Sequence, residues 1–130
     1  MIPKFRAWDK NTKKMNGMAE IYRNRKQEIE LLPRDDNIIV MQSTGLFDKN
    51  GQEIFEDYIV KTTIFFGRAD ESGGFYEYEK ELIGIVKQLE GTWVIDTEKG
   101  AVYLWSDINE NEVLGNTWEN PELLEEVKGD

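Results

Sequence analysis

Cysteine and histidine are both absent from this chain of 130 residues. Without cysteine there is no disulfide framework and no sign of an oxidising compartment. Cys-His and Ser-His-Asp catalysis are excluded within the chain, and zinc sites, which rely on the same ligands, are not expected. Any general acid or base would have to be an Asp, Glu, Lys or Tyr with a shifted pKa.

Long apolar runs are also missing. No segment approaches the roughly 18 apolar residues of a membrane helix, and the N-terminus lacks the apolar block of about 7–15 residues that marks a signal peptide. We therefore expect a soluble cytoplasmic protein with no membrane partner. Fifteen aromatic residues are present (four Trp, five Tyr, six Phe) and can supply the core of one domain.

The charge of the chain is unevenly distributed. The net charge is −10, but residues 1–34 hold nine Lys and Arg against four Asp and Glu, a net charge of +5. Residues 35–130 hold seven Lys and Arg against 22 Asp and Glu, a net charge of −15. Such asymmetry can mark a nucleic-acid-binding region or a contact between oppositely charged parts of an assembly.

Two interpretations of the basic region therefore stay open. In the first, it lies against the acidic remainder, in the same subunit or a neighbouring one. In the second, it forms a basic face for nucleic acid. The residues of that face are Lys10, Lys13, Lys14, Arg23, Arg25 and Lys26. We favour the first, because a net charge of −10 opposes the approach of a phosphate backbone.

A tight turn is predicted at Asp48-Lys49-Asn50-Gly51. Asp and Asn bond their own backbone and Gly supplies a positive φ, so Asn-Gly between apolar runs is typical of a hairpin. The alternative is a Ca²⁺ loop, but that loop requires Gly at the sixth position and Glu at the twelfth. Here Gly51 is fourth and Ile59 is twelfth. We expect a hairpin turn, no metal site and no cofactor.

Short strands separated by turn residues are expected along most of the chain. They are predicted near residues 5–8, 15–22, 27–32, 37–42, 58–66, 76–88, 92–96 and 101–105, with the longest loop at residues 67–74. This spacing favours a sandwich or small barrel, so the predicted fold class is mainly β. Asn120 and Pro121 predict the N-cap and first residue of a short helix through Val127. That helix is too short to be stable alone and must dock on its own domain or a partner.

Aromatic residues on strands usually belong to the core, but residues 75–78 adjoin the predicted loop. Phe75, Tyr76 and Tyr78 are therefore candidate binding residues. If they are exposed, they would form a contact surface for a protein or for stacked nucleobases.

Four segments, taken in order, carry a family resemblance: KFRAWD at residues 4–9, KKM at 13–15, MQSTGLFDKNGQEIFEDYIV at 41–60 and VLGNTWENPELL at 113–124. Together they resemble the YopX family, small proteins encoded by bacteriophages and prophages of Gram-positive bacteria. The resemblance implies an N-terminal β lobe (residues 1–45) followed by an SH3-like small barrel with a short C-terminal helix (residues 46–130). It implies no catalytic residues and no firm biochemical activity.

One departure from the family pattern affects two positions. The family usually has Glu-Gly-Asp-Ile-Val where this chain has Glu56-Asp57-Tyr58-Ile59-Val60. A Gly there indicates a positive φ, and Asp57 is among the residues that tolerate that conformation best. A role for the family's usual acid does not carry over to Tyr58.

Three functional hypotheses follow. The first is a non-enzymatic phage accessory protein in the host cytoplasm that binds a host or phage protein and associates with itself as a homo-oligomer. The second is a nucleic-acid-binding protein that uses the basic N-terminal face. The third is a carboxylate-metal hydrolase, since carboxylate-only Mg²⁺ sites need neither Cys nor His.

Overall fold

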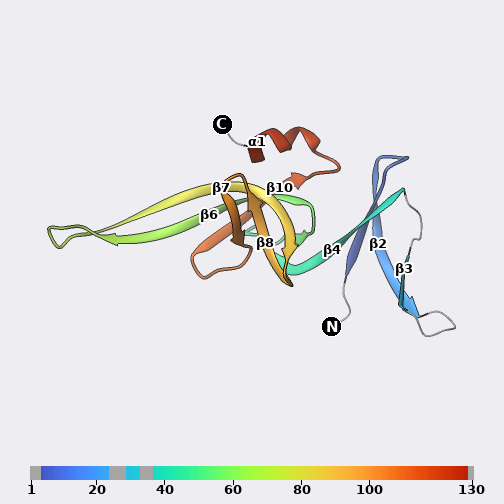
Figure 1. Ribbon diagram of the computed structural model, residues 1–130, viewed down its shortest axis with the longest axis horizontal. Coiled ribbons are helices and arrows are strands. Elements are labelled where there is room, and N and C mark those ends of the chain that lie inside the picture. The colour runs from blue at the N-terminus through green and yellow to red at the C-terminus, as the bar shows by residue number, and fades with distance from the viewer. Residues whose placement is uncertain (1–3, 24–28, 33–36, 129–130) are drawn as a thin grey trace.

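Two antiparallel sheets make up most of the computed structural model, which describes residues 4–23, 29–32 and 37–128 (Figure 1). The first sheet has the strand order β3-β2-β1-β4-β5 and the second has the order β10-β6-β7-β8-β9. The first sheet consists of β1 (Phe5–Asp9), β2 (Lys14–Arg23), β3 (Ile29–Leu32), β4 (Ile38–Phe47) and β5 (Glu53–Phe55). The second consists of β6 (Tyr58–Ala69), β7 (Phe75–Leu89), β8 (Thr92–Thr97), β9 (Gly100–Tyr103) and β10 (Asn109–Asn116).

The second sheet curls into a half-barrel (Figure 1). Its curvature brings β8 close to β7 at Gly84, where an added Cβ would lie 2.6 Å from the carbonyl oxygen of Asp96. Only glycine fits at this approach, which agrees with the bend expected there. The mainly β fold class, with a barrel-like sheet and a short C-terminal helix, is confirmed. None of the helical segments in the described part of the chain has the length and hydrophobicity of a membrane span.

One hydrophobic cluster joins the two sheets. From the first sheet it takes Trp8, Met41, Ile54 and Phe55, and from the second sheet and its loops Tyr58, Val60, Val86, Ile95 and Leu104. Phe55 and Tyr58 lie on either side of the sheet junction with their ring centroids 5.7 Å apart. The domain division expected between residues 45 and 46 stays a prediction.

The hairpin turn predicted at residues 48–51 is confirmed. Asp48 N–H donates to the Gln52 carbonyl at 2.8 Å, and Gly51 adopts φ +83°. The Asp48 carboxylate, 7% exposed, accepts hydrogen bonds from three backbone N–H groups, those of Asn50, Gln52 and Val113, each at 2.9 Å. Because Val113 belongs to β10, this carboxylate joins the turn of the first sheet to the edge of the second.

The positive φ expected at Asp57 is also confirmed, at +68°. Its carboxylate accepts a hydrogen bond from the indole N–H of Trp118 at 3.1 Å, and its carbonyl accepts one from the Thr117 N–H at 3.0 Å. The neighbouring Tyr58 is 2% exposed and accepts a hydrogen bond from Arg6. Position 58 is therefore a core position in this chain.

The structure differs from the elements expected from the sequence in five details. The strand β6 runs through Ala69, so the loop predicted at residues 67–74 is shorter, and β4 extends to Phe47. Strand β10 was not predicted, because NENEV is polar and reads as a loop. Trp105 lies outside β9 and is exposed. Asn120 makes no side-chain cap; its Oδ1 accepts a hydrogen bond from the Asn116 N–H instead.

The C-terminal helical segment docks on its own chain. It begins as a 3₁₀ turn, η1 (Pro121–Leu123), and continues as α1 (Leu124–Lys128). The 3₁₀ turn packs on β10, where the Cδ1 atom of Leu123 would lie 2.9 Å from a Cβ added to Gly115, and α1 contacts β7. The three apolar residues of the segment, Leu123, Leu124 and Val127, are half-buried there.

Candidate functional site

Strands β6 and β7 continue beyond the half-barrel as a two-stranded ribbon, residues 65–79. Within the described residues, β10 pairs with β6 only as far as Ile64, and β8 pairs with β7 only from Gly84 onward. Beyond those points the two strands pair with each other, from Phe65 opposite Glu79 to Ala69 opposite Phe75. The ribbon projects from one end of the molecule (Figure 1).

The tip of the ribbon is organised by Asp70. Its Oδ1 accepts hydrogen bonds from the Ser72 N–H, the Ser72 hydroxyl and the Gly74 N–H, and its own N–H donates to the Gly74 carbonyl at 2.8 Å. The Ser72 hydroxyl, followed by the backbone of Gly74, lowers the pKa of the Asp70 carboxyl below its usual range. The segment expected to be a long loop is therefore a hydrogen-bonded hairpin turn.

One face of the ribbon, the aromatic face, carries Phe66, Arg68, Tyr76 and Tyr78. These residues share a face because side chains alternate along a strand and directly paired residues point the same way. The rings of Phe66 and Tyr78 stack with centroids 4.9 Å apart, and Tyr76 lies 6.0 Å from Tyr78. Despite these ring contacts, Tyr76 and Tyr78 are 46% and 44% exposed.

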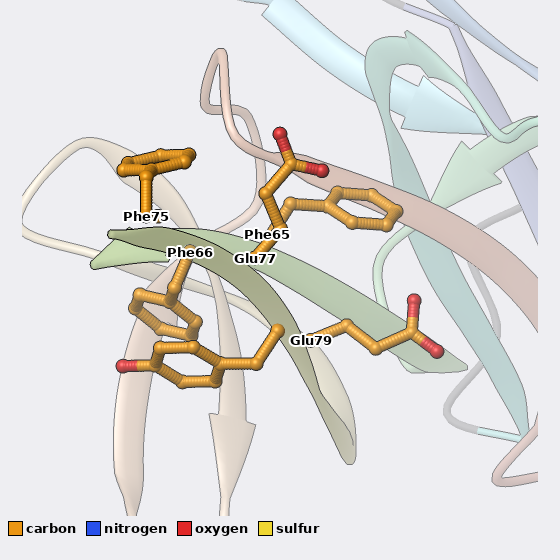
Figure 2. Close-up of a pocket in the computed structure, with 7 residues that line it drawn as sticks. Phe65, Phe66, Phe75, Glu77 and Glu79 are labelled. Atoms are coloured by element: carbon orange, nitrogen blue, oxygen red, sulfur yellow. The ribbon is translucent and has the colours of Figure 1, made fainter. Parts of the chain in front are cut away.

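The opposite face, the acidic face, carries Phe65, Phe75, Glu77 and Glu79. Figure 2 shows Phe65, Phe75 and Glu77 on one side of the strands and Phe66 on the other. Phe75 is 69% exposed and its ring lies over Gly67, where an added Cβ would be 2.5 Å from the ring. Residues of both faces line one shallow hollow on the ribbon (Figure 2).

The three N-terminal lysines of the expected basic face lie in a second exposed region, the β1–β2 turn. Lys10, Lys13 and Lys14 are all exposed. The turn is held by Asp9, whose carboxylate accepts hydrogen bonds from the N–H groups of Asn11 and Thr12 at 2.8 and 3.2 Å. Lys13 has φ +56° and donates its N–H to the Asp9 carbonyl.

The two groups of candidate residues do not form one site. The β1–β2 turn and the tip of the ribbon lie at opposite ends of the molecule (Figure 1). Of the other candidates, Arg25 and Lys26 lie outside the described residues. Arg23 ends β2, and its side chain also lies outside what the structure describes.

Tyr58 and Glu112 are ionisable residues whose side-chain contacts lie within the fold. No group of three acidic residues close enough to hold a metal ion occurs among the described residues. Burial raises the pKa of the Tyr58 hydroxyl despite the opposing effect of Arg6, so this buried phenol stays protonated at neutral pH. Glu112 forms an ion pair with Lys49 at 3.0 Å, which lowers the pKa of the Glu112 carboxyl.

Several exposed apolar residues were not singled out from the sequence. Phe65 belongs to the ribbon and is 46% exposed, although the run Thr63-Ile64-Phe65-Phe66 resembles part of a half-buried strand. Tyr103, Trp105 and Ile108 are 69%, 64% and 51% exposed, and Tyr103 and Ile108 line an apolar groove next to β9. These side chains are exposed because some strands continue beyond the ends of their neighbours. No local pattern in the sequence shows where a neighbouring strand ends.

Comparisons with known proteins agree with this architecture. The family model described as YopX protein matches residues 4–125. Among solved structures, the chain is similar to the crystal structure of protein EF1440 from Enterococcus faecalis, with 26% identity and a TM-score of 0.50. That similarity covers 95% of this chain and 99% of the EF1440 chain. No curated protein matches the chain.

Proposed function

This chain belongs to the YopX family, and we propose that it acts as a non-enzymatic protein-binding module of phage type. The observation that carries the proposal is the ribbon. All residues from 75 to 81 are exposed, and none of the core residues lies on the ribbon. Packing against the core therefore does not account for the five aromatic side chains of the ribbon or for the stacking of Phe66 on Tyr78.

Exposed aromatic residues in such a cluster are typical of protein contact surfaces. Isolated apolar side chains on a surface are ordinary, but contiguous patches mark interaction sites. Tyr and Phe lose little conformational entropy on binding and supply a large contact area. The Phe66–Tyr78 stack limits the freedom of both rings before a partner arrives, which reduces the entropic cost of association.

Self-association is part of the same proposal. Two further exposed side chains, Tyr103 and Ile108, line the groove beside β9. The groove is lined by Ile64 and Val102 as well, so its walls are mainly apolar. We expect copies of the chain to meet there, and Tyr103→Ser with Ile108→Asn to shift the protein to monomer in light-scattering measurements.

A protein partner is better supported than nucleic acid. A nucleic-acid site of the kind expected from the sequence combines cations for phosphates with aromatic rings for bases. Here the exposed lysines of the β1–β2 turn and the aromatic rings lie at opposite ends of the molecule. The ribbon itself carries Glu77 and Glu79, whose charges repel a phosphate backbone.

The test is capture of partners from bacterial lysate by the wild-type protein and by a Tyr76→Ser/Tyr78→Ser variant, both treated with nuclease. The proposal expects proteins that the wild type retains and the variant loses. A Phe47→Ser variant is the matched control, because Phe47 is an exposed aromatic residue outside both the ribbon and the groove beside β9. If the Tyr76/Tyr78 variant retains the same proteins as the wild type, or if nuclease removes them, the proposal fails.

A further inference from the structure

The outer edge of β7 is unpaired along the ribbon. Within the described residues, β8 begins to pair with β7 only at Gly84, and residues 75–81 are exposed. The opposite edge, on β6, is free over fewer residues, because the β10 side still supplies the Ile108 carbonyl to the Phe65 N–H at 2.8 Å. β7 thus offers the longer stretch of unpaired backbone.

The hydrogen bonds fix which residues of β7 face this edge. The pair Asp70–Gly74 is hydrogen-bonded across the hairpin, and hydrogen-bonded and non-hydrogen-bonded pairs alternate in an antiparallel ladder. Phe75, Glu77 and Glu79 therefore belong to non-hydrogen-bonded pairs and direct their N–H and C=O groups away from β6. The Phe65 N–H, opposite Glu79, points outward on the other side, as this alternation requires.

The side chains along this edge differ sharply between the two faces. Glu77, Glu79 and, by alternation, Glu81 lie on the acidic face, and none of them makes an ion pair with another described residue. Tyr76 and Tyr78 lie between them on the aromatic face. An added strand would place its own alternate side chains beside these two rows, since neighbours on adjacent strands share a face.

We propose that the β7 edge binds an extended segment of a partner protein as an added antiparallel strand, with Lys or Arg at alternate positions and apolar residues between them. The basic side chains would neutralise Glu77, Glu79 and Glu81, and the apolar ones would cover Tyr76 and Tyr78. Backbone hydrogen bonds to Phe75, Glu77 and Glu79 would supply affinity and the alternation would supply specificity. This inference rests on the proposed function, for which it names the partner's chemistry.

A second copy of the chain fits this edge poorly. Two β7 edges related by a two-fold axis centred on Glu79 would place Glu79 opposite Glu79 and Glu77 opposite Glu81. Like charges directly opposite in an antiparallel pair are destabilising. The charge pattern of the edge therefore favours a basic partner over self-pairing.

A synthetic heptapeptide that alternates lysine and valine tests the proposal. We expect it to bind the full-length protein, whereas a peptide of the same composition with its lysines in one block and a peptide alternating glutamate and valine do not. Hydrogen exchange at the Glu77 and Glu79 amides should slow when the peptide binds. The Tyr78 amide, already directed toward β6, should change little.

Two sets of variants separate backbone from charge. Glu79→Pro removes an outward N–H without breaking a bond to β6, and it should weaken peptide binding by about tenfold or more. Ala69→Pro is the matched control, because it removes an outward N–H from the other edge of the ribbon and should leave binding unchanged. Glu77→Lys/Glu79→Lys keeps the backbone intact and should bind the glutamate–valine peptide in preference to the lysine–valine peptide.

The outcomes distinguish this inference from the proposed function. If Glu79→Pro and Ala69→Pro both bind lysate partners and peptide as the wild type does, while Tyr76→Ser/Tyr78→Ser loses the lysate partners, edge pairing is overturned and the protein-binding function stands. Equal binding of the alternating and block lysine peptides also overturns it, since charge alone then accounts for binding. Self-association of the wild type that Glu79→Pro abolishes would identify a second copy as the occupant and would likewise overturn the inference.

Discussion

Asp57 combines two requirements in one side chain. Its backbone has φ +68°, a region where most side chains are strained, and its carboxylate accepts the Trp118 indole N–H at 3.1 Å. Glycine would meet the first requirement and lose the second. The aspartate therefore holds the C-terminal segment against the junction of the two sheets, while it keeps the backbone turn that leads into β6.

The free energy of unfolding of Asp57 variants should depend on how many of these two requirements each variant still meets. Asp57→Asn keeps both and should change the free energy of unfolding by less than about 1 kcal/mol. Asp57→Gly loses only the hydrogen bond, at about 1 kcal/mol, and Asp57→Ala loses both, at about 2 kcal/mol. Urea unfolding measures the series. Equal stability of the Gly and Ala variants would show that the positive φ carries no strain.

Asp48 is a buried acid whose carboxylate accepts three backbone hydrogen bonds. Burial acts to raise its pKa, but hydrogen bonds from the backbone N–H groups of Val113, Gln52 and Asn50 outweigh burial, and the pKa falls below its ordinary value of 3.8. A depressed folded-state pKa stabilises the fold above the unfolded-state value. That stabilisation is lost as the pH falls below 3.8 through the folded-state pKa.

Asp48→Asn should therefore destabilise the protein at neutral pH and flatten its acid unfolding. We expect a loss of about 2 kcal/mol at pH 7, because an amide oxygen replaces only part of the acceptor capacity for three buried N–H groups. The difference from wild type should shrink as the pH falls below 3.8. Denaturant unfolding at a series of pH values measures it.

Asp70→Asn is the matched control for Asp48→Asn. Asp70 has a similar pattern of turn hydrogen bonds but is exposed at the ribbon tip, so its substitution should have a much smaller effect. If the two variants lose equal stability, the link from Asp48 to β10 contributes nothing beyond the turn itself.

At the scale of elements, the C-terminal segment packs on the second sheet, against β10 and β7. Asn116, at the end of β10, accepts the Trp118 and Glu119 N–H groups at 3.0 and 2.8 Å and receives the Asn120 N–H on its carbonyl. This cluster turns the chain sharply, so that η1 packs back on β10. The segment is docked by local hydrogen bonds as well as by its apolar residues.

Removal of residues 117–130 should cost about 2–4 kcal/mol in the free energy of unfolding, because it deletes the half-buried Trp118 and both hydrogen bonds to Asp57. Removal of residues 121–130 alone keeps Trp118 and Asn120 and should cost about 1–2 kcal/mol. Thermal unfolding compares the two. A longer truncation as stable as the parent would contradict the role given to Trp118.

Elements with local signals could be predicted from the sequence, and those set by distant neighbours could not. The turn at Asp48–Gly51 and the helical segment after Pro121 each rest on a few adjacent residues, whereas the positive φ at Asp57 was expected from the glycine that the YopX family usually has there. Strand β10 rests instead on pairing with β6, which tolerates the polar NENEV segment at an edge. The sequence identifies Phe75, Tyr76 and Tyr78 as binding residues only if they are exposed. Their exposure depends on where β8 and β10 stop pairing with β7 and β6.

At the scale of the whole molecule, the core and the candidate binding surface occupy separate regions. The hydrophobic cluster lies where the two sheets meet, and the ribbon extends away from it (Figure 1). Buried residues of β6 end at Thr62, and those of β7 begin at Gly84. Stability and binding should therefore respond to different substitutions, which is unusual for a small domain whose surface and core share most elements.

A shortened ribbon tests this separation directly. Replacing residues 67–77 with Asn-Gly joins Phe66 to Tyr78, a hydrogen-bonded pair that a two-residue turn can close. Because no core residue is removed and the loop becomes shorter, we expect the free energy of unfolding to change by less than about 1 kcal/mol. Binding of lysate partners and of the lysine–valine peptide should be lost. A variant that unfolds would show instead that the ribbon stabilises the half-barrel, whereas a stable variant that still binds both would place the contact surface elsewhere on the molecule.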